Sequence, residues 1–203
     1  MNENNADSNK VKLITLGNSY VGKTSFIFRY IRKKFTDNYF PTIGFDRCSK
    51  EIRLSSGAII NLSFYDTAGQ ERYRSLAPNF IKIADGILLM YDITDDTSFK
   101  EISNWIESVN EAKGKDFPIL LIGNKVDLEE KRKVSKKEGE EKAKKNGYLF
   151  METSCKDNIN IEESVNALLS KVIKNKNLFG RKNMTLENKK QKKKKKKHKC
   201  FSS

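Results

Sequence analysis

The chain has 203 residues, enough for one α/β domain with a sizeable core and a tail but short for two independent domains. Its formal net charge is +14, yet eleven of its 40 lysines and arginines lie after residue 180 against one glutamate, so residues 1–180 have a net charge of only +4. The excess charge therefore belongs to the carboxyl-terminal tail and not to the globular part.

The cysteines, the histidine and the hydropathy disfavour several classes of protein. Cys48, Cys155 and Cys200 are widely separated, which is typical of a reducing compartment. The only histidine, His198, lies in the lysine run, so chemistry that needs a histidine base or a histidine-ligated metal is disfavoured. No apolar stretch approaches about eighteen residues and no amino-terminal signal region is present, so we expect no membrane span.

Short apolar strands and amphipathic helices alternate from Lys10 onward, after polar residues 1–9 that we expect to be disordered. The expected strands cover residues 11–16, 49–56, 58–65, 86–93, 118–124 and 148–154. The expected helices cover residues 24–33, 97–113, 135–146 and 159–175. A hairpin should turn around Ser56 and Gly57, and a capping box of Ser135 and Glu138 should start the third helix. Strands that are apolar throughout indicate a sheet covered by helices on both faces.

One motif lies at the boundary between the first strand and the first helix. Residues 17–24, GNSYVGKT, match the pattern GxxxxGK[ST] in the strand–loop–helix context of a phosphate-binding loop. Gly17 and Gly22 allow a tight turn whose backbone N–H groups face the phosphates. Lys23 can place its ammonium on the terminal phosphates, and Thr24 can offer its hydroxyl to Mg²⁺. We call residues 17–24 the phosphate loop.

Two further motifs follow strand ends, where ligands bind in open α/β sheets. Asp66 begins DTAGQ, so its carboxylate can hold a metal-bound water, and Gly69 can bring its backbone N–H near a γ-phosphate. Asp127 ends NKVD, where a carboxylate can accept two hydrogen bonds from the N1–H and N2–H₂ edge of guanine. Adenine offers no such pair of donors, so this site can discriminate against it by about 10⁴ or more. The predicted base is guanine.

These motifs occur in the order and spacing of a known family. GNSYVGKT, Thr42, DTAGQ, NKVD and ETSCK resemble the five nucleotide-binding boxes of the Ras-like small GTPases, over residues 10–176. TIGFD, ERYRSL and LMYDIT further resemble the Rab branch, whereas Arg47, Tyr65 and the large Tyr20 of the phosphate loop depart from its usual residues. The resemblance implies a P-loop NTPase fold of the α/β class. Its sheet would have six mostly parallel strands with helices on both faces and one antiparallel edge hairpin.

The resemblance also implies roles for individual residues. Those implied to act in hydrolysis are Lys23, Thr42 and Gln70, the last by orienting the attacking water. Those implied to hold Mg²⁺ are Thr24, Thr42 and Asp66. Those implied to contact GTP or GDP around the phosphates are Gly17, Ser19, Tyr20, Val21, Gly22, Lys23, Thr24, Ser25, Tyr39, Thr42 and Gly69. Those implied to contact the base are Phe35, which stacks on it, and Asn124, Lys125, Asp127, Ser154, Cys155 and Lys156.

Residues 177–203 form a lysine-rich tail with no apolar periodicity beyond Leu186, and we expect it to be disordered because like charges repel. The chain ends in Cys200, Phe201, Ser202 and Ser203, which fits a CaaX prenylation box that favours farnesyl. One lipid chain binds membranes only marginally, but each basic residue near an anionic leaflet adds about 1 kcal/mol, so the two signals together can anchor the chain. No aromatic platform accompanies the lysines, so specific nucleic-acid binding is not expected.

The predicted function is a GTP-binding and GTP-hydrolysing switch of the Rab type, which regulates vesicle traffic by recruiting effectors in its GTP state. Its expected partners are an exchange factor, an activating protein, effectors, a prenyl transferase and a prenyl-binding chaperone, and the protein itself is expected to be a monomer. Its expected location is the cytoplasmic face of an endomembrane, Golgi or vesicles, in exchange with the cytosol, and the plasma membrane is also compatible. Three alternatives stay open at this point: a Ras- or Rho-type signalling GTPase at the plasma membrane, a non-hydrolysing GTP-binding scaffold, and a nuclear or nucleic-acid-associated protein addressed by the lysines.

Overall fold

The structure, a computed structural model, describes residues 9–36, 45–54, 57–67, 77–176 and 178. The elements in chain order are β1 (Lys10–Leu16), α1 (Lys23–Arg32), β2 (Phe45–Arg53), β3 (Ile59–Thr67), α2 (Ala77–Ile83), β4 (Gly86–Asp92), α3 (Asp96–Lys100), α4 (Ile102–Lys113), β5 (Ile119–Asn124), the 3-10 helix η3 (Val126–Lys131), α5 (Lys136–Lys145), β6 (Leu149–Thr153) and α6 (Ile161–Lys176). None of the helices in these ranges is long and apolar enough to cross a membrane.

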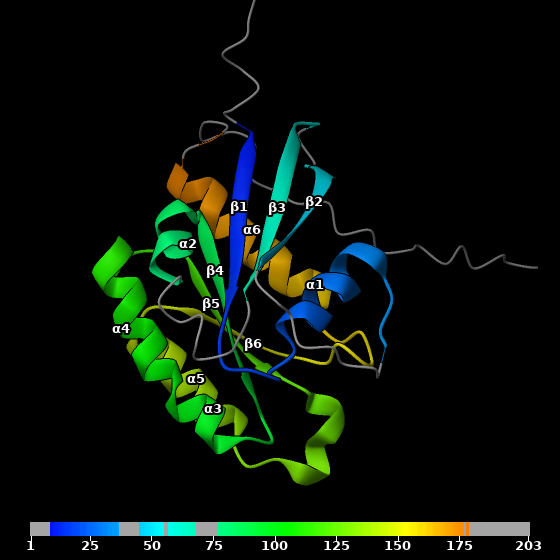
Figure 1. Cartoon of the computed structure of the whole chain (residues 1–203), viewed down its shortest axis with the longest axis vertical. Helices are drawn as coiled ribbons and strands as arrows, with labels where there is room; N and C mark the ends of the chain where they lie inside the picture. Colours follow the sequence, from blue (N-terminus) through cyan, green and yellow to red (C-terminus); the bar gives the residue numbers. More distant parts are fainter. Residues whose placement is uncertain (1–8, 37–44, 55–56, 68–76, 177, 179–203) are drawn as a thin grey trace, which may run out of the picture.

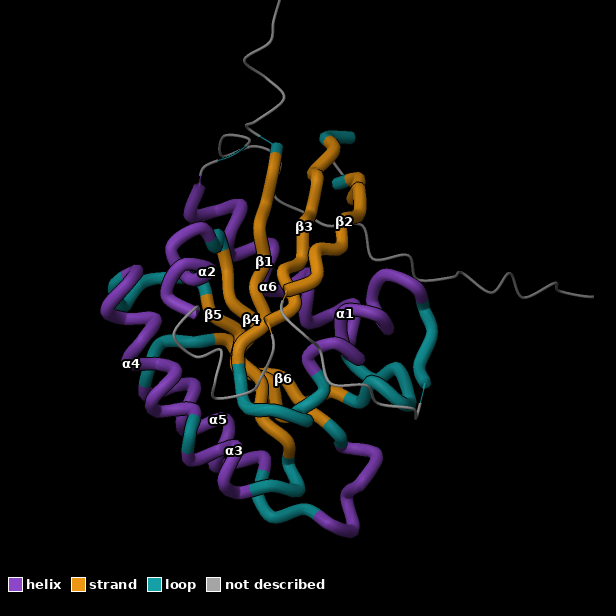
Figure 2. The backbone as a smooth tube through the Cα atoms, in the orientation of Figure 1, coloured by secondary structure: helices purple, strands orange, loops and turns teal. Residues whose placement is uncertain are grey.

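The six strands form one sheet in the order β2-β3-β1-β4-β5-β6. All neighbouring strands run parallel except β2 and β3, which pair antiparallel from Phe45 opposite Thr67 to Arg53 opposite Ile59. Gly57, in the turn between them, has a left-handed φ of 82°. The predicted fold class, a mostly parallel six-stranded sheet with one antiparallel edge hairpin, is therefore confirmed. Figure 1 shows the twisted sheet, and Figure 2 separates the strands from the surrounding helices.

Each face of the sheet is covered by its own hydrophobic core. Side chains alternate along the inner strands, so Leu13 and Leu88 join one cluster and Ile14 and Leu89 join the other. Helices α1 and α6 pack on the first cluster, and α2, α4 and α5 pack on the second (Figure 1). Leu178 also packs on the first cluster.

Some helix boundaries differ from the sequence-based expectation. The helix predicted over 97–113 consists of α3, capped by the Asp95 carboxylate at the Thr97 N–H, and a separate α4. Helix α6 begins at Ile161 instead of residue 159 because Asn158 and Asn160 adopt left-handed backbone angles that end the preceding turn. The short elements α2 and η3 were not predicted. The capping box of Ser135 and Glu138 at the start of α5 is confirmed.

The fold brings the sequence motifs to one edge of the sheet. The phosphate loop follows β1, Asp66 lies near the end of β3, NKVD covers the end of β5, and ETSCK covers the end of β6. Because these strands are parallel to one another, their carboxyl ends lie on the same side. Asn9 and Lys176 lie at the opposite end, where the Asn9 carbonyl accepts from the Asn61 N–H and Lys176 Nζ donates to the Lys10 carbonyl.

Candidate functional site

The phosphate loop is held against its neighbours by two glycines in the left-handed region. Gly17 has a φ of 137°, and a Cβ added there would lie 2.2 Å from the Met90 carbonyl oxygen. Gly22 has a φ of 97°, and its added Cβ would lie 2.3 Å from Asn124 Nδ2. Side chains at these positions would push the loop away from β4 and β5. The loop is therefore compact enough to present its backbone to a ligand, as anion-binding loops require.

The Lys23 side chain folds back over the phosphate loop. Its Nζ donates to the carbonyl oxygens of Gly17 at 2.9 Å and Asn18 at 2.7 Å, and it is only 5% exposed. Burial lowers the pKa of Lys23 to about 8, although the nearby Asp66 carboxylate favours the charged form. An ammonium has three donors, so two bonds to the loop are compatible with a third to an anionic ligand. The loop thus holds the Lys23 ammonium against its own carbonyls.

Thr24 and Asp66 bring oxygen ligands together beside this lysine. Thr24 Oγ1 donates to Asp66 Oδ2 at 2.5 Å, and Thr15 Oγ1 lies 3.4 Å from Asp66 Oδ1. Asp66 is 4% exposed. Mg²⁺ prefers such hard oxygen ligands and is usually held by one or two carboxylates together with substrate phosphates. The described residues contain no group of three or more histidine, cysteine, aspartate and glutamate side chains that would form an all-protein metal cage. The donor set therefore fits Mg²⁺.

Asn124 connects the phosphate loop to the other end of the site. Its Nδ2 donates to the Val21 carbonyl at 2.9 Å, and its Oδ1 accepts from Thr153 Oγ1 at 3.0 Å. The Cys155 thiol lies 3.5 Å from the same Oδ1. Asn124 is 1% exposed, so in this structure its amide positions the loops and does not face solvent. Burial raises the pKa of the Cys155 thiol to about 12, so the thiol stays neutral at physiological pH.

The NKVD and ETSCK segments meet through Asp127 and Ser154. Ser154 Oγ donates to Asp127 Oδ1 at 2.6 Å and accepts from the Asp157 N–H at 2.9 Å. Lys125 has a left-handed φ of 73° and pairs with Asp92, with 2.6 Å between Nζ and Oδ2. The Asp127 carboxylate is therefore oriented by a hydroxyl from the neighbouring strand end. This leaves Oδ2 as the acceptor that the Ser154 bond does not use.

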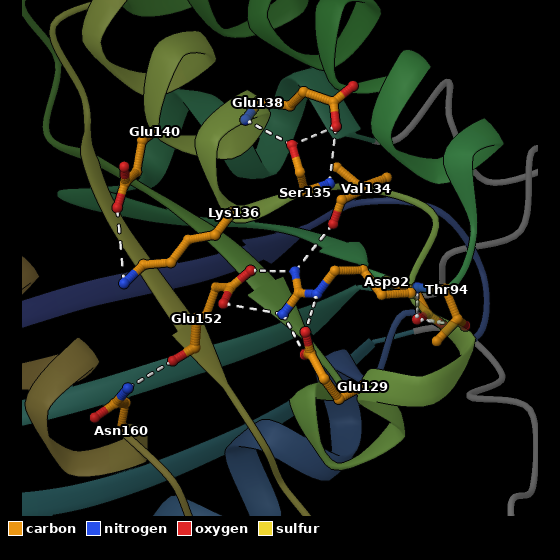
Figure 3. Close-up of polar contacts among 11 residues, drawn as sticks. Asp92, Thr94, Glu129, Val134, Ser135, Lys136, Glu138, Glu140, Glu152 and Asn160 are labelled. Atoms are coloured by element: carbon orange, nitrogen blue, oxygen red, sulfur yellow. Dashed lines mark hydrogen bonds and ion pairs between the residues drawn. The ribbon is translucent and has the colours of Figure 1, made fainter.

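An arginine that sequence analysis missed holds these two segments together. Arg132 follows η3 and donates to Glu152 at 2.6 and 3.2 Å, to Glu129 at 2.8 and 2.6 Å, and to the Val134 carbonyl at 2.9 Å. These five bonds use all five donors of a guanidinium. Figure 3 shows Glu129, Glu152 and Val134 in one cluster of polar contacts, with Ser135 and its capping partner Glu138 nearby. The end of NKVD and the start of ETSCK are thus fixed relative to each other.

The other predicted site residues have different environments. The Val21 side chain is buried in the first cluster, the one that α1 and α6 cover, so only the Val21 backbone is available to a ligand. Phe35 packs partly against the same core, and Lys156 is exposed. Tyr20 has a left-handed φ of 65° and is 62% exposed.

The placement of the remaining predicted residues is simpler. Ser19 within the phosphate loop and Ser25 in the first turn of α1 are both half-buried. The predicted residues that lie outside the described part of the chain are Tyr39, Thr42, Gly69, Gln70 and Cys200. Their roles stay predictions. A second missed contact is the hydrogen bond from Trp105 Nε1 of α4 to Asn18 Oδ1 at 3.2 Å, which joins α4 to the phosphate loop.

Comparison with known proteins gives two findings. The sequence model described as the Ras family matches residues 12–174. The Ras-related protein Rab-13 of Mesocricetus auratus is 40% identical over 162 residues, which cover 80% of this chain and 79% of Rab-13. The residues matched by the family model include the phosphate loop, Asp66, NKVD and ETSCK.

Proposed function

Because the chain belongs to the Ras family of small GTPases and is Rab-like, we propose that the site described above binds GTP and GDP, with the residues in the roles given below. As a Rab-like member of this family, the protein is a GTP-hydrolysing switch in membrane traffic. Members of this family bind GTP or GDP with Mg²⁺ and act through exchange factors, activating proteins and effectors. Signalling in another branch, a non-hydrolysing scaffold and a nuclear role are not favoured.

At the phosphate end, we assign the backbone of the phosphate loop and Lys23 to the β- and γ-phosphates. The Lys23 ammonium is already directed into the loop by the Gly17 and Asn18 carbonyls, so phosphate binding needs little reorganisation. Thr24 and Asp66 would hold Mg²⁺, which when bound neutralises charge on the phosphate oxygens. With Mg²⁺ bound, the Thr24 hydroxyl oxygen would be a metal ligand while its O–H would still donate to the Asp66 carboxylate.

At the base end, we assign Asp127 to the N1–H and N2–H₂ groups of guanine. Ser154 orients the carboxylate through Oδ1, and the bond between Asn124 and Val21 sets the separation of the base and phosphate ends. This last contact is the observation on which the proposal depends most, because it joins both halves of the site through one buried side chain. Hydrolysis itself is assigned to Gln70, which orients the attacking water, with Lys23 and Thr42 stabilising the transferred phosphoryl group.

The test of this assignment is a change of base specificity. Asp127→Asn should prefer xanthine over guanine nucleotides, because an amide can donate to the xanthine O2 carbonyl that replaces the guanine amino group. Competition binding with GTP and xanthosine triphosphate measures the preference. Asp157→Asn is the control, because Asp157 is exposed and contacts Ser154 through its backbone N–H, which the substitution retains. Continued preference of Asp127→Asn for GTP would contradict the assignment of the base edge.

We further propose that Cys200 is prenylated and that the tail lysines add attraction to an anionic membrane. A prenyl transferase and a prenyl-binding chaperone would then be additional partners. The proposed location is the cytoplasmic face of Golgi or vesicle membranes, in exchange with the cytosol. Support for this comes from the adjacency of Cys200 to the lysine run and from similarity to Rab-13.

A further inference from the structure

Arg29 of helix α1 links that helix to the ETSCK segment, and we propose that it is a positioning residue for recognition of the guanine base. The inference rests on the proposed function, because it concerns the same base-binding segments. Arg29 contributes to none of the sequence motifs and lies more than 120 residues from the segment it contacts.

The contact is a fork from one guanidinium to two successive carbonyls. Arg29 Nε donates to the Cys155 carbonyl oxygen at 2.6 Å, and Nη2 donates to the Lys156 carbonyl oxygen at 2.7 Å. The first of these bonds is partly buried. A planar guanidinium has donors with a fixed relative geometry, so two short bonds define both the position and the orientation of the peptide between them.

That peptide determines where the base-selecting carboxylate is held. Cys155 and Lys156 lie between Ser154 and Asp157, whose N–H donates to Ser154 Oγ. Ser154 Oγ in turn donates to Asp127 Oδ1 at 2.6 Å. A shift of the two carbonyls would therefore move the hydroxyl that orients Asp127. Arg29 fixes this turn through its two carbonyl oxygens.

The same guanidinium also contacts the end of its own helix and the aromatic ring beyond it. Nη1 lies 3.3 Å from the Lys33 carbonyl oxygen, and the guanidinium carbon lies 5.7 Å from the centroid of the Phe35 ring. Lys33 has a left-handed φ of 56° that ends α1 and redirects the chain toward Phe35. Arg29 therefore holds the candidate stacking residue and the ETSCK segment in one arrangement.

The experiment compares release of GDP and of inosine diphosphate, which lacks the guanine 2-amino group. Fluorescently labelled forms of both nucleotides are released from the full-length protein in excess Mg²⁺. Arg29→Ala should accelerate GDP release about tenfold. This is the low end of the effect expected from losing two charge-assisted hydrogen bonds, because the bond to the Lys156 carbonyl is exposed. Inosine diphosphate lacks the 2-amino group assigned to Asp127, so the same substitution should accelerate its release less. The ratio of the inosine diphosphate release rate to the GDP release rate should therefore move toward one.

Arg32→Ala is the matched control, because it also removes a guanidinium from α1. The Arg32 guanidinium is exposed and lies over the Phe28 ring, not on the ETSCK segment. Arg29→Lys retains the charge but not the fork and should give intermediate rates, which keeps the test valid if Arg29→Ala folds poorly. Unchanged rates, or equal acceleration of both nucleotides with an unchanged ratio, would overturn the positioning role. If the wild-type protein bound neither nucleotide, the proposed function would fail and this inference with it.

Discussion

Replacing Arg132 with alanine should destabilise the protein far more than removing an exposed ion pair. The substitution deletes five hydrogen bonds and leaves the Glu152 carboxylate, which is 13% exposed, without its counter-charge. Breaking a buried pair by removing one partner costs about 3–5 kcal/mol. Because the Arg132 side chain is 17% exposed, we expect the lower end, about 3 kcal/mol. For a domain of this size that loss lowers the melting temperature by about 6–12 °C.

The assay is urea unfolding at pH 7 with GDP and Mg²⁺ at saturating, equal concentrations, and the Kd of each variant for GDP is measured so that the contribution of nucleotide binding can be subtracted. Lys136→Ala is the control, because Lys136 and Glu140 form an exposed pair with 3.8 Å between Nζ and Oε1 (Figure 3). Its loss should cost about 0.5 kcal/mol or less. Glu152→Gln combined with Arg132→Ala should be less destabilised than the sum of the single variants. A cost for Arg132→Ala no larger than that of Lys136→Ala would refute the reasoning.

Three further outcomes follow from the site and the tail. Burial lowers the pKa of Lys23 to about 8 and bound phosphate favours its charged form, so GDP binding should take up protons at pH 8.5 but not at pH 6.5. Calorimetry in buffers of different ionisation enthalpy measures this uptake, and equal uptake at both values would contradict it. Gln70→Leu should retain GTP affinity and lose stimulated single-turnover hydrolysis by orders of magnitude, whereas equal loss of both would make Gln70 structural. Cys200→Ser protein from its native host should keep only a weak, salt-sensitive association with anionic vesicles, and unaltered co-sedimentation would reject the lipid anchor.

The sheet was predictable because its signals are local. Continuous apolar runs such as those of β4 and β5, each followed by a polar strand end, indicate buried parallel strands within a few residues of sequence. The missed α2 spans seven residues, too few for a helical period to stand out, and Pro78 near its start resembles a turn signal. The break between α3 and α4 falls at Glu101, whose backbone angles are still helical, so no residue type there indicates it.

The candidate site was predictable only where one continuous motif specifies the chemistry. The phosphate loop and NKVD each contain their functional groups within a few residues. The contacts of Arg29 with Lys156, of Arg132 with Glu152 and of Trp105 with Asn18 join positions that are 20 to 127 residues apart, and no local pattern marks either partner. The partners are often backbone carbonyls, which every residue has. Such contacts become visible only when the fold has placed the segments side by side.

Asn124 explains why the two ends of the site depend on each other. Its amide donates to the Val21 carbonyl within the phosphate loop and accepts from Thr153 at the end of β6, while the absence of a side chain at Gly22 makes room for it. A carboxylate of similar shape could not donate to the carbonyl, so the residue must be an amide for reasons of loop geometry as well as any contact with the base. Displacement of the base-binding segments would therefore reach the phosphate loop through the buried bond between Asn124 and Val21. This gives a physical route by which release of the base and release of the phosphates can occur together.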